Sequence, residues 1–89
     1  MRIIIIYRPN SEYGRIVEEY IHDFNHDHPD AKLETLNIDS REGSRIAELY
    51  GIMVYPAILA LEDDGHMQQQ WEGIEKMPLM NDLAYYSTR

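Results

Sequence analysis

Histidines and aspartates gather between positions 22 and 30, and both are residue types that bind transition metals. His22 and His26 stand four residues apart, so a helix would place them on one face. The same stretch also fits a helix end and the polar loop after it, where a histidine is favourable without a ligand. We therefore expect neither a metal site nor a cofactor. The weak metal candidates are His22, His26 and His28.

Ser11 is the other side chain that could begin a reaction, as a nucleophile. A serine nucleophile needs a neighbouring general base. The histidines lie far along the chain from it, so Ser11 or its neighbour Asn10 is expected to cap a helix instead. The chain has no cysteine, which excludes a thiolate nucleophile, a disulfide and a cysteine-based metal site.

The charge of the chain limits its partners. With 16 acidic and 8 basic residues, the formal net charge is −8. Nucleic acids and anionic membrane surfaces attract basic proteins, so we expect neither as a partner. No stretch has the length of a membrane span, and the apolar run after Met1 is too short for a signal peptide. A cytoplasmic location is expected.

Two strands and a helix account for the first 38 residues. Residues 2–7 form a β-branched run without alternation, typical of a central strand covered on both faces. A helix of about four turns is predicted from Glu12. Its apolar face comprises Ile16, Val17, Tyr20, Ile21 and Phe24. Residues 25–30 predict a loop and residues 31–38 an edge strand, parallel to the first through a right-handed crossover.

The rest of the chain predicts a helix, a hairpin and a final helix, which completes one domain over residues 1–89. A short capped helix runs from Ser40 to Gly51, where the glycine ends it. The hairpin strands span 57–62 and 66–72 and meet at a tight turn. The final helix is expected to have Pro78 in its first turn, where proline is tolerated. Its buried stripe would consist of Leu79, Leu83 and Tyr86.

Pro56 stands at the start of the strand over 57–62. Proline lacks a backbone N–H and is normally excluded from sheet interiors, so it must begin this strand. Two conformations fit these residues: a cis Tyr55–Pro56 bond that turns the preceding backbone toward a surface groove, or a trans proline that only opens the strand.

Four segments together resemble the thioredoxin-like superfamily, which includes thioredoxins and glutaredoxins. They are Leu36-Asn37-Ile38-Asp39, Tyr50-Gly51-Ile52 leading into Val54-Tyr55-Pro56, Asp64-Gly65, and Gly73-Ile74. The resemblance covers nearly the whole chain. It implies an α/β fold of three layers, α/β/α, in the order βαβ-α-ββ-α, with a four-stranded mixed sheet. It also implies a cis-proline before the third strand, at Pro56.

The redox motif of that family, two cysteines separated by two residues, falls on Ser11-Glu12-Tyr13-Gly14. Both cysteine positions are therefore occupied by other residues, Ser11 and Gly14. The usual tryptophan before the first cysteine is Asn10, and the buried acid of many thioredoxins is Ile5. Thiol–disulfide exchange requires a thiolate. The resemblance thus implies a redox-inactive, non-enzymatic relative.

A shallow groove that takes an extended peptide is a further feature of the family. The corresponding residues here are Pro9, Asn10, Ser11, Tyr13, Val54, Tyr55, Pro56, Gly73 and Ile74. Tyrosine is enriched at interface hot spots, and we expect a protein or peptide partner. One alternative is a glutathione-like small anion at the helix start, held by Arg8 and Arg15. Another is a purely structural or oligomerising domain, which would use the Gln-rich edge strand or the edge of the strand over residues 31–38.

Overall fold

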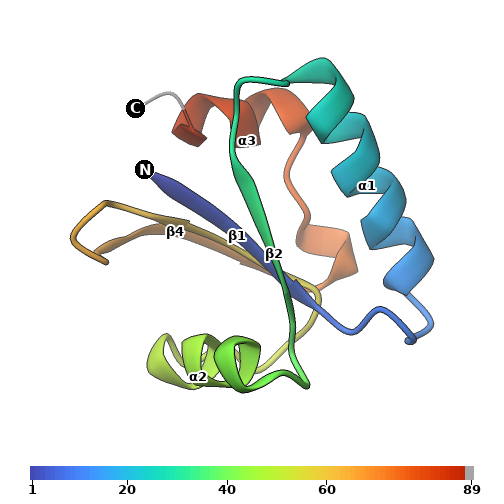
Figure 1. The fold of residues 1–89 in the computed structure, drawn as a ribbon, viewed down its shortest axis with the longest axis vertical. Helices are drawn as coiled ribbons and strands as arrows, with labels where there is room; N and C mark the ends of the chain where they lie inside the picture. Colours follow the sequence, from blue (N-terminus) through green and yellow to red (C-terminus); the bar gives the residue numbers. More distant parts are fainter. Residues whose placement is uncertain (88–89) are drawn as a thin grey trace.

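A computed structural model gives the fold and describes residues 1–87. Four strands form one sheet in the order β2-β1-β3-β4, with three α-helices and one 3₁₀ helix (Figure 1). The strands are β1 (Arg2–Tyr7), β2 (Leu33–Asn37), β3 (Ala57–Leu61) and β4 (Met67–Glu72). The helices are α1 (Gly14–Asp27), α2 (Arg41–Leu49), η1 (Ile74–Lys76) and α3 (Met80–Ser87).

The sheet is mixed, as predicted. β2 runs parallel to β1, whereas β3 is antiparallel to both β1 and β4. α1 and α3 cover one face and α2 covers the other, with the sheet between them (Figure 1). This arrangement confirms the predicted α/β class and its three layers.

The isoleucine run of β1 explains why the sheet is covered on both sides. Successive strand residues point to opposite faces. Ile4 and Ile6 join the core beneath α2, while Ile3 and Ile5 join the core beneath α1 and α3. All four are essentially inaccessible to solvent. A fully apolar strand is therefore stable only between two helical layers.

The second helix begins and ends as its sequence predicts. The Ser40 side chain accepts a hydrogen bond from the Gly43 N–H at 3.0 Å, an N-cap. A Cβ at Gly43 would lie 2.1 Å from the Asn37 carbonyl oxygen, so only glycine fits there. Gly51, with φ +67°, then takes the left-handed conformation that glycine favours after a helix.

The first helix differs from its prediction at both ends. It starts at Gly14 rather than Glu12, and Ser11 does not cap it, because the Ser11 hydroxyl donates to the Arg8 carbonyl at 2.6 Å. Its N-cap is Tyr13, which makes no side-chain hydrogen bond. At the other end, residues 25–27 continue the helix instead of forming a loop. Phe24 is fully buried and anchors this last turn.

The predicted stripe of the final helix is partly wrong. Leu83 is fully buried, but Leu79 is 75% exposed. Pro78 and Leu79 precede α3, and the Leu79 carbonyl accepts the Leu83 N–H, so Leu79 belongs to the cap and not to the buried face. Ile16, expected on the apolar face of α1, is likewise half exposed. No helix within residues 1–87 is long and apolar enough to cross a membrane.

Candidate binding groove

A hollow of about 200 Å³ lies where β1 ends, α1 begins and β3 begins. We call it the groove. Its lining residues are Tyr7, Arg8, Ser11, Tyr13, Val17, Ile38, Tyr55 and Pro56. Val17 and Pro56 are buried beneath it, whereas Tyr13 is 39% exposed. The hollow therefore has an apolar floor and an aromatic rim.

The loop between β1 and α1 forms one wall and is closely hydrogen bonded. The Arg8 carbonyl accepts from both the Ser11 N–H (3.1 Å) and the Ser11 hydroxyl (2.6 Å). The Gly14 N–H donates to the Ser11 carbonyl at 3.1 Å. A Cβ at Gly14 would lie only 2.0 Å from the Pro9 carbonyl oxygen. This loop conformation leaves no space for any side chain at position 14.

The segment before β3 forms the opposite wall. The Tyr55–Pro56 peptide bond is cis, and the Tyr55 hydroxyl donates to the Ile52 carbonyl at 3.0 Å. Gly73 donates its N–H to the Pro56 carbonyl at 2.8 Å. Within the described residues, the main-chain N–H and carbonyl of Tyr55 make no hydrogen bond. An open main-chain position therefore borders the groove.

Glu72 supports this segment and was not predicted from the sequence. Its carboxylate accepts the Met53 N–H at 3.0 Å and the Val54 N–H at 3.4 Å. The other carboxylate oxygen accepts from the Gln70 side chain at 3.2 Å. These bonds connect β4 to the loop before Tyr55. A glutamate at the end of an edge strand carries no sequence signal for this role, because its partners lie 18 and 19 residues away.

The charged groups at the groove are paired with each other. Arg8 donates two hydrogen bonds to the Asp39 carboxylate, both 3.0 Å long. This pair raises the pKa of Arg8 and lowers the pKa of Asp39. The Tyr7 hydroxyl donates to Glu18 at 3.3 Å, and partial burial, followed by the Glu18 charge, raises the pKa of Tyr7. Asp39 therefore neutralises the Arg8 charge, which leaves this guanidinium little attraction for an anion.

The structure gathers part of the predicted groove. Arg8, Ser11, Tyr13, Tyr55 and Pro56 line it together. The other predicted positions do not line it: Pro9, Asn10, Val54, Gly73 and Ile74. Gly73 and Val54 lie close to each other, since a Cβ at Gly73 would be in ordinary van der Waals contact with the Val54 side chain, at 3.5 Å. Three residues that line the groove were not predicted from the sequence: Tyr7, Val17 and Ile38.

Arg15, a predicted anion contact, is turned away from the groove. It lines a separate depression on α1 and pairs with Glu19 at 3.6 Å. One helical turn separates these two residues, which is the ordinary spacing of a surface ion pair. Arg8 and Arg15 thus do not converge on one anion site.

The histidines are also dispersed. His22 and His26 are exposed on α1 and lie beside their own neighbours Asp23 (3.5 Å) and Asp27 (3.2 Å). The His28 ring packs against Phe24, with centroids 5.1 Å apart. Within residues 1–87, no three histidine, aspartate or glutamate side chains gather as a metal site would require.

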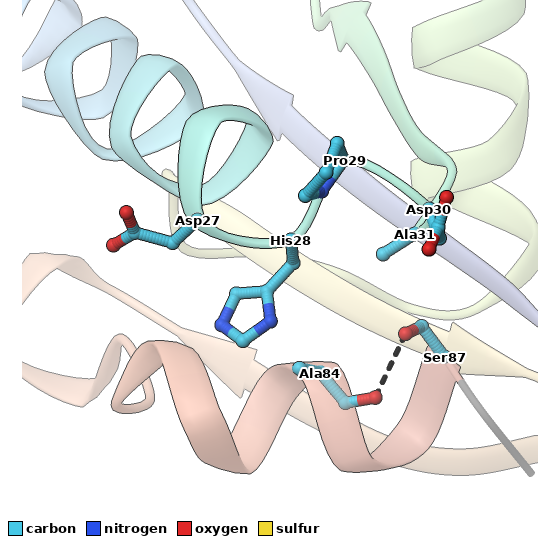
Figure 2. A pocket seen from close by; sticks show the side chains of 7 residues that line it. All are labelled: Asp27, His28, Pro29, Asp30, Ala31, Ala84 and Ser87. Carbon is cyan, nitrogen blue, oxygen red and sulfur yellow. Dashed lines mark hydrogen bonds between the residues drawn. The ribbon is translucent and has the colours of Figure 1, made fainter.

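His28 instead lines a hollow of about 290 Å³ between the end of α1 and α3. In Figure 2 its ring extends toward α3, while the Asp27 side chain extends away from the hollow. Ser87 donates its hydroxyl to the Ala84 carbonyl at 2.7 Å, so this polar group is already satisfied within α3 (Figure 2).

Solved structures with a similar fold were found by structural comparison. Mitochondrial thioredoxin 3 from Saccharomyces cerevisiae, in its oxidized form, superposes with a TM-score of 0.68 over 97% of this chain and 74% of its own, at 16% identity. The fold is that of thioredoxin. A structure on the thiol resolving mechanism in yeast mitochondrial 1-Cys peroxiredoxin, via glutathione/thioredoxin systems, matches with the same TM-score, identity and coverage. No family model and no curated protein sequence matches the chain.

The predicted thioredoxin-like fold is thereby confirmed. At 16% identity the likeness establishes the fold alone. One feature separates this chain chemically from thiol enzymes of that fold, because it contains no cysteine.

Proposed function

We propose that this domain is a redox-inactive thioredoxin-fold module that binds an extended peptide or protein segment in the groove beside Pro56. Two observations support the loss of thiol chemistry. Cysteine is absent from the chain. In addition, the position that resembles the second cysteine, Gly14, faces the Pro9 carbonyl at a distance that excludes a side chain. The domain thus acts by binding and not by catalysis.

The observation that carries the peptide proposal is the open main chain of Tyr55. Its N–H and carbonyl lack partners in the described residues, and the groove lies directly beside them. An extended peptide can pair with such a position as an added strand, since main-chain hydrogen bonds supply affinity while adjacent pockets select side chains. Tyr13 and Tyr55 offer amphipathic rings to that peptide.

Three large apolar side chains near the end of α2 and in the segment after it are more than half exposed: Leu49, Met53 and Val54. Exposed apolar side chains can contribute to protein contact sites. The Glu72 carboxylate holds the Met53 and Val54 backbone. These two side chains are therefore presented by an ordered loop, where they would add to the contact area of a bound segment.

The small-anion alternative has weaker support. A glutathione-like ligand would need free positive charge at the start of α1, but Arg8 is engaged by Asp39 and Arg15 pairs with Glu19. A purely structural role would use the open edges of β2 or β4. Neither alternative accounts for the open Tyr55 backbone beside a hollow.

An NMR titration of the ¹⁵N-labelled protein tests the proposal. One titration adds a mixed library of extended peptides, and a separate titration adds glutathione. Peptide-induced shifts at residues 11–15, Tyr55 and Gly73 are expected. For a selected peptide, methylation of its backbone amides should abolish binding, because a methylated amide cannot donate to the Tyr55 carbonyl. Shifts in this region with glutathione alone would favour the anion alternative.

Two tyrosine variants provide the matched comparison. Tyr13→Ala should weaken peptide binding, whereas Tyr85→Ala should not, since Tyr85 is an exposed tyrosine of α3 outside the groove. Peptide-induced shifts that are absent from the groove, or equal losses in both variants, would contradict the proposal.

A further inference from the structure

A second hollow, of about 340 Å³, lies between the β4 edge and α3 and shares no residue with the groove. We call it the aromatic corner. Its lining residues are Gln69, Trp71, Pro78, Asp82, Tyr85 and Tyr86. Three of these are aromatic and one is a carboxylate, a composition found at no other hollow described above.

Local geometry explains why these side chains share one site. Gln69 and Trp71 alternate along β4, so they point to the same face of the sheet. Asp82, Tyr85 and Tyr86 are three and four residues apart on α3, so they share one helix face. Two elements each present one face, and the hollow forms between them.

The three rings form two nearly perpendicular pairs, and Tyr86 belongs to both. The Trp71 and Tyr86 centroids are 5.5 Å apart with an interplanar angle of 79°, and those of Tyr85 and Tyr86 are 5.6 Å apart at 82°. Trp71 and Tyr86 also pack against the core beneath α3. Their orientations are therefore fixed by the fold. Tyr85 is 60% exposed and forms the outer wall.

The electrostatic character of the corner is negative. Asp82 is exposed, and in residues 1–87 its carboxylate has no ion-pair or hydrogen-bond partner. No lysine or arginine of this part of the chain lines the hollow. Nearby, burial and then the Asp82 charge raise the pKa of Tyr20 to about 12, and the Tyr20 hydroxyl donates to the Pro78 carbonyl at 2.9 Å. The Asp82 charge thus acts on the residues around the corner.

We propose that the aromatic corner binds a methylated ammonium group. Aromatic faces attract a cation through their quadrupole, and rings set at right angles surround its methyl groups on several sides. The Asp82 carboxylate at the rim attracts the positive charge of the ammonium group. A quaternary ammonium has no N–H to donate, so it needs no hydrogen-bond acceptors arranged around it. The net charge of −8 adds long-range attraction for a cation. Such a group occurs in small quaternary amines such as choline and in methylated lysine side chains.

The single tryptophan makes the test direct, because Trp71 is the only tryptophan in the chain and lines the site. Tetramethylammonium chloride and choline chloride are titrated while tryptophan fluorescence and the indole N–H resonance are recorded. The neutral isostere of choline, 3,3-dimethyl-1-butanol, is the control ligand, since it has the same shape without charge. Saturable changes at millimolar choline, and much weaker ones with the isostere, are expected.

Three variants separate charge, aromatic contact and general effects. Asp82→Asn should weaken choline binding roughly two- to fivefold, the range of an exposed ion pair. Tyr85→Ala should weaken it by a similar factor, as expected for one exposed cation–π contact. Glu48→Gln on α2, across the sheet, changes the net charge equally and should leave binding unchanged. Equal binding of the isostere, no response to the cations, or an equal loss in Glu48→Gln would overturn the proposal.

A pair of lysine peptides then distinguishes the two sources of the cation. A peptide with trimethyllysine that binds more tightly than both choline and its unmethylated version would identify a modified protein as the source. Choline that binds as tightly as the trimethyllysine peptide would identify a small amine.

Discussion

The groove and the aromatic corner are both built where helices meet the ends or edges of the sheet, yet their chemistry is opposite. At the groove the charged side chains satisfy each other, as in the Arg8–Asp39 pair, and the open groups belong to the Tyr55 main chain. At the aromatic corner the side chains dominate: three rings line the hollow, and within residues 1–87 the Asp82 carboxylate has no ion-pair or hydrogen-bond partner.

This difference determines what each site can discriminate. Main-chain pairing accepts many sequences in an extended conformation, so the groove would select a shape. Rings and a carboxylate respond to charge and methylation, so the aromatic corner would select a chemical group. The two proposals together assign this small domain two binding sites with different selectivity.

The largest effect is expected where the groove depends on a close backbone contact. Gly14→Ala would place a methyl group 2.0 Å from the Pro9 carbonyl oxygen. Because the obstacle is backbone and not a flexible side chain, the loop must move, and the free energy of unfolding should fall by about 3 kcal/mol. Chemical denaturation measures this change, and tryptophan fluorescence reports whether the aromatic corner is retained.

Gly51→Ala provides the control for a simple loss of glycine. Gly51 has φ +67°, but no atom lies within 4 Å of the place that an alanine methyl group would take, so only backbone strain of about 1–2 kcal/mol is expected. A smaller loss in Gly14→Ala than in Gly51→Ala would mean that the Pro9 contact does not hold the loop.

The next effect concerns Glu72, which supports the groove from outside it. Glu72→Ala removes the acceptor of the Met53 and Val54 N–H groups, at a cost of about 1–2 kcal/mol in unfolding free energy. Glu72→Gln keeps one carbonyl oxygen and should lose less. Peptide binding at the groove should weaken in Glu72→Ala while choline binding at the aromatic corner stays unchanged. A parallel loss at both sites would show that they are coupled.

Most of the fold could be predicted because its signals are local. The isoleucine run of β1, the Ser40 cap and the glycine after α2 each fix an element through neighbours in sequence. The errors occurred at helix ends, where several local hydrogen-bonding arrangements compete. Serine is a common helix N-cap, but the Ser11 hydroxyl donates to the Arg8 carbonyl instead, and α1 begins at Gly14. Leu79 is four residues before Leu83, the spacing of a helix face, but it lies before the first residue of α3.

The candidate sites show the same limit more strongly. The Tyr13 and Tyr55 parts of the groove were predicted through a family resemblance, whereas the roles of Ile38 and Glu72 arise from packing between distant segments. The aromatic corner was not predicted at all. Trp71 and Tyr86 are 15 residues apart, with a turn and a 3₁₀ helix between them, so no periodicity connects them.

A smaller effect on stability is expected at Tyr20, whose pKa is raised by burial and by the Asp82 charge at the aromatic corner. Its hydroxyl bonds the Pro78 carbonyl, so Tyr20→Phe should cost about 1 kcal/mol in unfolding free energy at pH 8. Between pH 10 and about 12 the unfolded state loses its tyrosine proton while the folded state keeps it, so the wild-type protein loses stability as pH rises. Phenylalanine does not titrate, and the difference between the two proteins should therefore shrink over this range. A constant difference would contradict the raised pKa.

The same titration compares the two sites directly. Asp82→Asn should lower the pKa of Tyr20, because it removes a negative charge that disfavours the tyrosinate. Asp39→Asn, which changes an acid at the groove, should leave that pKa unchanged. Ultraviolet absorbance of the tyrosinate follows both variants.

The smallest change in stability, but an informative one, is expected for Asp39→Asn itself. The Arg8–Asp39 pair is exposed, and screening by solvent makes such pairs weak, so unfolding should be almost unaffected at pH 7. The lowered pKa of Asp39 means that any stabilisation exists above the ordinary aspartate range and disappears as pH falls through the folded-state value. The variant should nevertheless free the Arg8 guanidinium at the groove. Glutathione should then shift the Ser11 and Tyr13 amides in Asp39→Asn and not in the wild-type protein. If it shifts neither, neutralisation of Arg8 by Asp39 is not what keeps glutathione from the groove.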